Sequence, residues 1–372
     1  MALSPRFLLS GYYGFGNLGD EALLGIIVTQ LRARWPRCTV DVLSNDPAET
    51  ARTYGVEATP RADFGTVRTA IERADIVLSG GGGLLQNITS LRSLLYYTGI
   101  IRRAIRAQKP TMIFAQSVGP LDFWGKTVVR QFCRGVDVAT VRDERSRELL
   151  APLLSGTPVE RTADPVFLLA PGESPLDLAA EGLGPENDPL VVVSVRRWNG
   201  ADATSAALAA AVDRLAEAHG ARVAFLPLGG AADAEASTAV IRKCRTTPVL
   251  LPHYPLAQAA QVIGRARFVI GMRLHALIIA ARLGVPFIAL PYDPKVTALL
   301  EDLRYPLEPL FVPGARPPAA PVIEQRIDAA WSRRDELATH LHDMAAEVAA
   351  LAERNFDVLD ELVTKNAKNM QA

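Results

Sequence analysis

The residues of this 372-residue chain that are best placed to do chemistry are Arg273 and His275. They follow a short apolar run at 268–270 and precede an apolar stretch with helical character, so both lie where a strand turns into a helix. Backbone N–H groups at a helix start attract anions, and a guanidinium adds a permanent, planar positive charge. An imidazole gains or loses a proton near neutral pH. The segment predicts an anion site with a proton-transfer group, unless Arg273 only pairs with a carboxylate and His275 only caps or packs.

Other cations also follow predicted strands. Arg196 and Lys295 do so in the second half of the chain, and Arg142 does so in the first half. The carboxyl ends of parallel strands share one edge of a sheet, which is where ligands bind in open α/β folds. We therefore predict that Arg196, Arg273 and Lys295 converge on one anion, with Arg142 approaching from a facing domain.

Two glycine-rich turns follow predicted strands in the first half. Residues 14–19 fit the G-x-G-x-x-G pattern, and Asp41 lies about 20 residues further on, as in a dinucleotide site. Asp20 and Glu21 come directly after the third glycine and would repel a pyrophosphate, so the turn favours a ligand with hydroxyl groups. The second turn is the glycine run 80–83, which allows close backbone approach to a ligand.

Side chains and glycines around these turns are the candidates for binding such a hydroxyl-bearing ligand. We call them the candidate acceptor-binding residues. Gln86 and Asn87 could contact sugar hydroxyls or cap the following helix, and the turn at 116–120 could be an ordinary one. The predicted set is Gly16, Asn17, Gly82, Gln86, Asn87 and Ser117.

Short apolar runs alternate with longer helix-like segments along most of the chain. Such alternation predicts parallel sheets covered by helices on both faces. It pauses at a stretch rich in proline, glycine and acids. We predict an α/β chain of two doubly wound, Rossmann-like domains facing across a cleft, with a C-terminal helical segment. The expected divisions are 1–170, a linker at 171–189, 190–322 and C-terminal helices at 323–372.

Composition excludes several classes of protein. Hydrophobic residues make up 49% and charged residues 22% of the chain, which is a globular profile. Lys+Arg and Asp+Glu both number 40, so no overall field favours nucleic acid or an anionic membrane. The three cysteines are scattered and match no metal-ligand spacing. The balanced charge leads us to expect no binding of nucleic acid. No apolar run reaches the roughly 18–20 residues that span a bilayer, so we expect a cytoplasmic protein.

Residues 11–22, Gly-Tyr-Tyr-Gly-Phe-Gly-Asn-Leu-Gly-Asp-Glu-Ala, resemble the opening motif of polysaccharide pyruvyl transferases. Further motifs follow in the family's order, and the resemblance covers about residues 8 to 300. The chain is most similar to the bacterial cell-wall enzymes called CsaB. The matching segments are 80–84, 116–120, 141–146, 271–276 and 292–296.

This resemblance implies a fold like that of the two-Rossmann GT-B glycosyltransferases, with the tail helices packing back on the first domain. It also implies phosphoenolpyruvate as donor, no cofactor or metal, and a saccharide acceptor, namely N-acetylmannosamine in a lipid-linked cell-wall precursor met at the inner face of the membrane. His275 and Asp20 are the expected catalytic residues. The expected donor-binding cations are Arg142, Arg196, Arg273 and Lys295.

Three other functions are compatible with parts of the pattern. A GT-B nucleotide-sugar glycosyltransferase would also use cations, in its case to stabilise a leaving diphosphate. A binding protein for an anionic sugar would bind its ligand without releasing phosphate. A nicotinamide oxidoreductase would bind the pyrophosphate of its cofactor at the glycine motif, although the acids that follow the motif would repel that pyrophosphate.

Overall fold

The computed structural model describes residues 4–88, 90–170, 176–184, 188–197, 201–290, 293–310 and 318–371. The chain divides into two compact units. Unit 1 comprises Met1–Leu168 and Ala349–Ala372, and unit 2 comprises Leu169–Val348. Within the described ranges, no helix combines the length and apolarity needed to cross a bilayer.

Unit 1 is built on a parallel sheet of seven strands in the order β3-β2-β1-β4-β5-β6-β7. The strands are β1 (Arg6–Tyr13), β2 (Thr39–Ser44), β3 (Glu57–Pro60), β4 (Ile76–Leu85), β5 (Thr111–Val118), β6 (Val138–Val141) and β7 (Val159–Arg161). The helices between them are α1 (Leu18–Arg34), α2 (Pro47–Tyr54), α3 (Phe64–Arg73), α4 (Leu91–Arg106), α5 (Phe123–Phe132) and α6 (Glu144–Leu150). The 3-10 helix η1 (Pro165–Leu168) follows β7.

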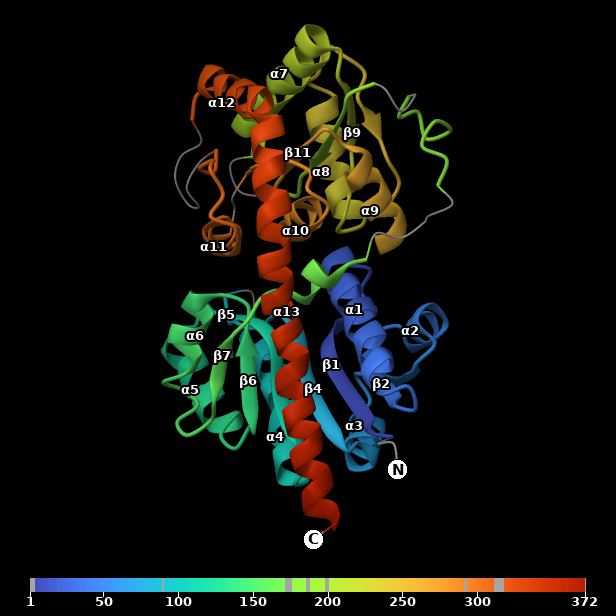
Figure 1. The fold of residues 1–372 in the computed structure, drawn as a ribbon, viewed down its shortest axis with the longest axis vertical. Helices are drawn as coiled ribbons and strands as arrows, with labels where there is room; N and C mark the ends of the chain where they lie inside the picture. The colour runs from blue at the N-terminus through green and yellow to red at the C-terminus, as the bar shows by residue number, and fades with distance from the viewer. Residues whose placement is uncertain are drawn as a thin grey trace. The chain divides into compact units, whose positions relative to one another are not determined.

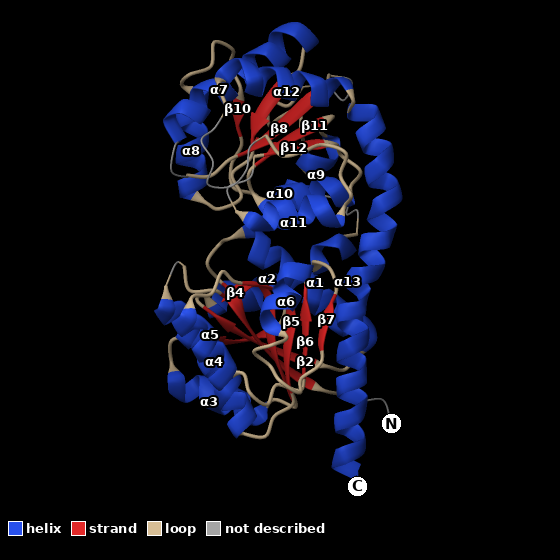
Figure 2. Cartoon of the chain, turned by 90° about the vertical axis from the view of Figure 1, so that its left-hand side faces the viewer, coloured by secondary structure: helices blue, strands red, loops and turns tan. Residues whose placement is uncertain are grey.

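Helices cover both faces of this sheet (Figure 2). On one face, α3, α4 and α5 bury apolar side chains against the strands. On the other face lie α1 and the end of α13 (Arg334–Gln371), where the rings of Phe114 and Phe356 meet edge to face with centroids 5.1 Å apart. Alternate residues of β1 serve the two faces, because Phe7 and Leu9 pack in one core and Leu8 in the other.

Unit 2 holds a second parallel sheet, of five strands in the order β10-β9-β8-β11-β12. The strands are β8 (Leu190–Ser194), β9 (Arg222–Phe225), β10 (Val249–Leu250), β11 (Phe268–Gly271) and β12 (Phe287–Ala289). The accompanying helices are α7 (Ala201–His219), α8 (Ala231–Ile241), α9 (Leu256–Arg265), α10 (Leu274–Arg282), α11 (Pro294–Asp302) and α12 (Ala320–Ser332). Two α/β units with parallel sheets confirm the predicted fold class.

The C-terminal segment is helical, as the sequence predicts, and consists of α12 and the long α13 (Figure 1). In unit 2, α12 packs against α7. From Ala349 onward α13 belongs to unit 1, where Arg354 pairs with Glu160 at 2.6 Å and Arg34 pairs with Glu353 at 2.6 Å.

The stretch 171–189, predicted as a linker, is described in part, since residues 171–175 and 185–187 lie outside the described ranges. Its central part packs within unit 2. Leu183 is buried there, and the Arg222 guanidinium donates to the Gly182 carbonyl at 2.6 Å.

Candidate functional site

Unit 2 gathers three cations at the carboxyl edge of its sheet. Arg196 follows β8, Arg273 follows β11, and Lys295 lies in the first turn of α11 after β12. These strands are neighbours in the order β8-β11-β12. The topology therefore brings Arg196, Arg273 and Lys295 to one edge of one sheet.

Arg273 is held by a buried carboxylate. Its Nε donates to Asp233 Oδ2 at 2.7 Å, and its Nη2 donates to Asp233 Oδ1 at 2.5 Å. Asp233 is fully buried and also accepts from the Gly229 N–H at 2.7 Å. The bidentate pair carries no net charge, but it fixes the guanidinium plane and leaves three of its five N–H groups to point elsewhere. Arg273 thus pairs with a carboxylate and is also oriented at the strand edge.

His275 lies in the first turn of α10 and is half-buried. Arg273 is the N-cap residue of this helix and gives it no side-chain cap, so the first backbone N–H groups keep their affinity for an anion. Sequence reasoning passed over a second histidine at the same edge, His253, which follows β10. Its Nδ1 lies 3.2 Å from the carbonyl oxygen of Pro227, which fixes the ring against the turn after β9.

In unit 1, the glycine-rich turn between β1 and α1 is braced by Glu21. The Gly14 N–H donates to Glu21 Oε1 at 2.8 Å, and the Tyr54 hydroxyl donates to Glu21 Oε2 at 3.0 Å. Gly14 and Gly16 both adopt positive φ, at 76° and 69°. Of the two acids at the helix start, Glu21 therefore maintains the turn.

Asp20 lies beside the glycine run of β4. The Asn17 side-chain amide donates to the Asp20 carboxylate and orients it. A Cβ on Gly82, where φ is +92°, would lie 2.8 Å from Asp20 Oδ1, so only glycine allows this close approach. The nearby Tyr13 hydroxyl is buried and has no hydrogen-bond partner among the described residues. Burial, followed by the negative charge of Asp20, raises the pKa of Tyr13, so the phenol stays neutral and can donate.

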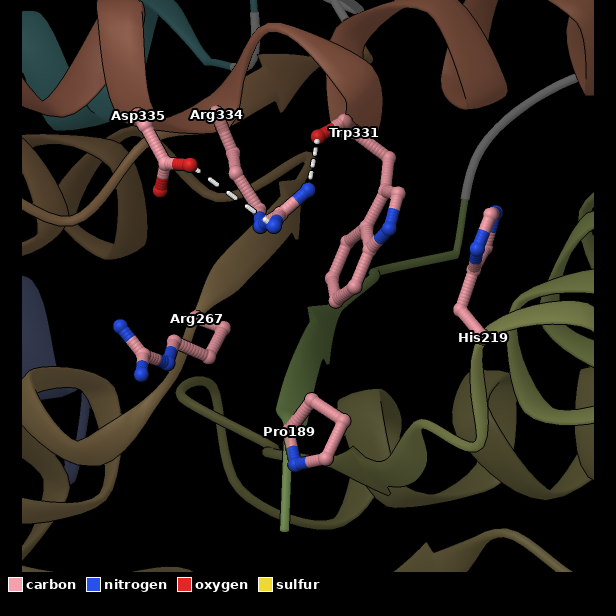
Figure 3. Close-up of a pocket in the computed structure, with 6 residues that line it drawn as sticks. All are labelled: Pro189, His219, Arg267, Trp331, Arg334 and Asp335. Atoms are coloured by element: carbon pink, nitrogen blue, oxygen red, sulfur yellow. Dashed lines mark hydrogen bonds and ion pairs between the residues drawn. The ribbon is translucent and has the colours of Figure 1, made fainter. Parts of the chain in front are cut away.

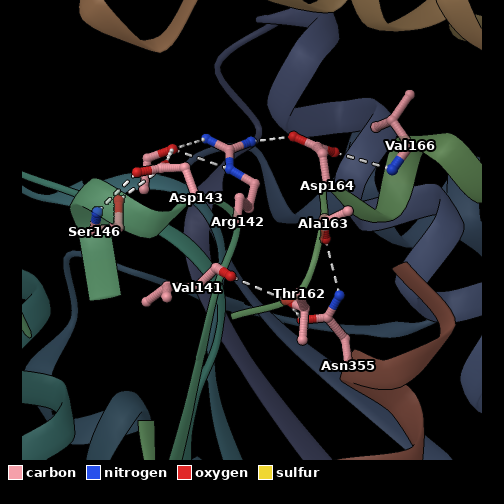
Figure 4. Close-up of polar contacts among 10 residues, drawn as sticks. Val141, Arg142, Asp143, Ser146, Thr162, Ala163, Asp164, Val166 and Asn355 are labelled. Atoms are coloured by element: carbon pink, nitrogen blue, oxygen red, sulfur yellow. Dashed lines mark hydrogen bonds and ion pairs between the residues drawn. The ribbon is translucent and has the colours of Figure 1, made fainter. Parts of the chain in front are cut away.

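Arg142 is the first residue after β6, as predicted, and is nearly fully buried (Figure 4). Its Nη1 forms an ion pair with Asp164, which is buried as well. Its Nε and Nη2 donate to the Ser117 hydroxyl at 3.1 and 2.9 Å. Three of the five guanidinium N–H groups are thereby used, and two remain.

The carboxylate that holds Arg142 is itself positioned by α13. Asn355 is fully buried; its side-chain amide donates to the Ala163 carbonyl at 2.9 Å and accepts from the Thr162 hydroxyl at 2.8 Å (Figure 4). These two residues directly precede Asp164. The C-terminal helix therefore fixes the backbone that presents Asp164 to Arg142.

Two of the predicted acceptor-binding residues form hydrogen bonds that hold the fold together. The Ser117 hydroxyl accepts twice from Arg142 and donates to Asp143 Oδ2 at 3.3 Å, which uses its full hydrogen-bonding capacity. Asn87 Oδ1 accepts from the Asp122 N–H at 3.1 Å and holds the start of α5. Gly16 leaves open space where a Cβ would stand, and Gln86 directly follows β4.

Asp41, which has the spacing of a ribose-binding acid, lies within β2. Its carboxylate accepts from the Thr59 hydroxyl of the neighbouring β3 at 3.0 Å. Burial raises the pKa of Asp41. This side chain serves the packing of the sheet and lies within a strand rather than at a strand end, which counts against the dinucleotide interpretation.

A separate cavity of about 540 Å³ lies in unit 2 (Figure 3). Pro189 and Arg267 directly precede β8 and β11, so this cavity is at the amino edge of the sheet, opposite the cations described above. Trp331 is covered by His219, whose ring centroid is 5.4 Å away, and by the Arg334 guanidinium at 4.9 Å.

Among the described residues, no three His, Cys, Asp or Glu side chains lie close enough together to bind a metal ion.

Solved structures with the same fold include a glycosyltransferase and two proteins solved with UDP. A glycosyltransferase from Rickettsia africae has 10% sequence identity and a TM-score of 0.65, covering 97% of this chain and 99% of that one. S. aureus MnaA, solved with UDP, has 10% identity and a TM-score of 0.64 over 97% of both chains. Anabaena Alr3699/HepE, solved with UDP and glucose, has 14% identity and a TM-score of 0.60 over 99% of both chains. No curated protein sequence matches this chain significantly.

The fold is therefore the GT-B fold, with two Rossmann-like units built on parallel sheets. The family model for polysaccharide pyruvyl transferases matches residues 17–294. This chain belongs to the polysaccharide pyruvyl transferase family.

Proposed function

We propose that this chain transfers a pyruvyl group from phosphoenolpyruvate to a saccharide of a cell-wall polysaccharide precursor, with N-acetylmannosamine on a lipid carrier as acceptor. The products are a cyclic ketal and free phosphate. One observation carries the proposal. A histidine in the first turn of a helix lies at a sheet edge with three cations, in a chain that belongs to this family.

Unit 2 supplies the donor-binding residues in this proposal. Phosphoenolpyruvate carries a carboxylate and a phosphate, which need several charge-assisted hydrogen bonds. Arg196 and Lys295 lie at this edge together with Arg273, and the start of α10 adds backbone N–H groups that attract an anion. Arg273 contributes oriented N–H donors. Arg142 of unit 1, with two N–H groups beyond its bonds to Ser117 and Asp164, is proposed as a further donor-binding residue.

The proposed chemistry begins with proton transfer from His275 to the methylene carbon of the donor. The neighbouring carbon becomes electrophilic, and a sugar hydroxyl adds to it while the hydroxyl proton passes to Asp20. Phosphate then leaves with the electrons of its C–O bond, and a second hydroxyl adds to close the ketal while its proton passes to the released phosphate. The cations stabilise charge on the departing phosphate, where fixed dipoles and charges have their largest effect.

The direct test is incubation of the purified chain with phosphoenolpyruvate and glycosides of N-acetylmannosamine. We expect the acceptor to gain the mass of one pyruvyl ketal and an equal amount of phosphate to appear. Ligand binding without phosphate release would instead indicate a binding protein. Since similar folds were solved with UDP, a thermal-shift titration with UDP is the second arm. Stabilisation by UDP and none by phosphoenolpyruvate would favour a glycosyltransferase.

Substitution of Gly229 tests whether the orientation of the Arg273 guanidinium matters for donor binding. A Cβ at this position would lie 2.0 Å from Arg273 Nη2 and 2.9 Å from Asp233 Oδ2, so Gly229→Ala must displace the guanidinium. Losing one or two charge-assisted hydrogen bonds to the donor should raise the KM for phosphoenolpyruvate by about ten- to a hundredfold. Gly264→Ala is the matched control, because its Cβ meets only the Leu283 side chain, at 3.3 Å. Equal KM values for the two variants would remove Arg273 from donor binding.

A further inference from the structure

Large apolar side chains are exposed on one part of unit 1. Phe123 and Trp124, the first residues of α5, are 74% and 66% exposed, and Ile88, just before α4, is 69% exposed. Soluble surfaces rarely concentrate such residues without a binding role. We define the docking face by six exposed side chains, Phe64, Ile88, Leu91, Leu95, Phe123 and Trp124.

These side chains come from segments that contact one another, since α4 packs against both α3 and α5. The Asp122 N–H donates to Asn87 Oδ1 at 3.1 Å, which joins the start of α5 to the loop that carries Ile88. On the other side of α4, the Arg103 guanidinium lies 5.1 Å from the ring of Phe64. A cavity of about 610 Å³ lies in this region, and its lining includes Phe64, Leu95, Arg61, Arg92 and Arg103. The docking face is therefore carried by neighbouring segments of unit 1, with arginines beside Phe64 and Leu95.

The segment that carries Ile88, Leu91 and Leu95 has an excess of positive charge. Between Asp75 and Asp122 the sequence contains no acidic residue and five basic ones, Arg92, Arg102, Arg103, Arg106 and Lys109, although the whole chain has zero net charge. Two acids directly precede docking-face residues in the sequence, and both cap helix starts. Asp63 accepts from the N–H groups of Gly65 and Thr66, and Asp122 accepts from that of Gly125. A local positive field of this kind attracts anionic surfaces within a Debye length, about 8–10 Å at ordinary salt.

We propose that the docking face binds the surface of an anionic phospholipid bilayer. Tryptophan and phenylalanine rings insert at the boundary between headgroups and acyl chains, while arginines contact lipid phosphates. A nucleic acid would satisfy the arginines but would leave the exposed aliphatic side chains in water. The contact is peripheral, because no described helix is long and apolar enough to cross a bilayer.

The docking face continues to the glycine-rich turn through Arg61. The Arg61 guanidinium lies 4.3 Å from the ring of Tyr96 on α4 and 4.9 Å from the ring of Phe15 in the turn. Docking would therefore place the residues around Asp20 close to the membrane surface, where the saccharide of a lipid-linked acceptor would lie. This consequence rests on the proposed function, whereas lipid binding itself does not.

The test is co-sedimentation of the full chain with vesicles of phosphatidylcholine alone or mixed with phosphatidylglycerol. We expect binding to the mixed vesicles only, weakening as salt rises. Phe123→Ser with Trp124→Ser should lower the partition constant at least about tenfold, since two large apolar groups no longer leave water. Arg92→Gln with Arg103→Gln should lower it by about tenfold at low salt.

The matched controls are Leu250→Ser, an exposed apolar residue of unit 2, and Arg37→Gln, an exposed arginine elsewhere on unit 1. Both should bind like the unmodified chain. The proposal is overturned if the unmodified chain ignores phosphatidylglycerol, or if the docking-face variants bind as the controls do. It is also overturned if sedimentation velocity shows that the aromatic substitutions abolish a dimer, because the face would then belong to a second copy. Vesicle binding needs no catalysis, so its failure is distinct from failure of pyruvyl transfer.

Discussion

Replacing His275 by alanine should slow phosphate release from phosphoenolpyruvate, measured with acceptor present, by about 10²–10⁴-fold. The effect is large because, in the mechanism we propose, protonation of the methylene carbon precedes every later step, and water is a poor substitute for a positioned acid. His275 lies in the first turn of α10, at the same carboxyl edge of the unit 2 sheet as Arg196, Arg273 and Lys295. Donor binding should survive, since those cations remain in place.

Two measurements separate lost chemistry from lost structure in this variant. Thermal stabilisation by phosphoenolpyruvate should persist in His275→Ala, and His342→Ala, an exposed histidine on α13, should keep full activity. An unchanged rate of phosphate release in His275→Ala would exclude the acid role. Loss of donor binding together with turnover would instead make His275 a donor ligand.

The sequence predicts strand-end positions well, because their signal is local. An apolar run followed by a glycine or a charged residue is enough to place Arg142 after β6 and Arg273 after β11. Parallel topology then follows from the alternation of strands and helices. Two strands escape this reasoning. β3, with the sequence Glu-Ala-Thr-Pro, and β7, with Val-Glu-Arg, lie at the edges of the unit 1 sheet and have no apolar run.

The carboxylates that pair with Arg142 and Arg273 could not be predicted, because neither lies near its arginine in the sequence and neither follows an apolar run. Asp164 follows the weak strand β7, and Asp233 lies in α8, 40 residues before Arg273. Each pair forms only once neighbouring strands are aligned in the sheet. The same holds for Ser117 and Asn87, whose hydrogen bonds to Arg142 and to the Asp122 backbone depend on the packing of separate segments. The chemistry that a residue can perform can be predicted from its type. Which of its hydrogen-bonding groups are already used by other residues can be known only from the fold.

Asp164→Ala should destabilise unit 1 by about 3–5 kcal/mol, because it leaves the buried Arg142 guanidinium without its ionic partner. Both side chains are nearly fully buried, at 6% and 5% exposure, so water cannot replace the lost carboxylate. Hydrogen exchange should accelerate correspondingly in β5, which contains Ser117, and in β6, which directly precedes Arg142. Glu144→Ala, which breaks the exposed pair of Glu144 with Arg147 nearby, should leave exchange almost unchanged. Equal exchange in the two variants would show that Asp164 does not sustain Arg142.

The double variant Arg142→Met with Asp164→Leu separates structure from function at this pair. Replacing a buried ion pair by apolar side chains of similar volume is often neutral or stabilising, so slow hydrogen exchange should return. If Arg142 binds the donor, the double variant should still show a raised KM for phosphoenolpyruvate despite its recovered stability. Recovery of both stability and KM would mean that Arg142 and Asp164 only hold the ends of β6 and β7 together. Donor binding would then rest on the unit 2 cations alone.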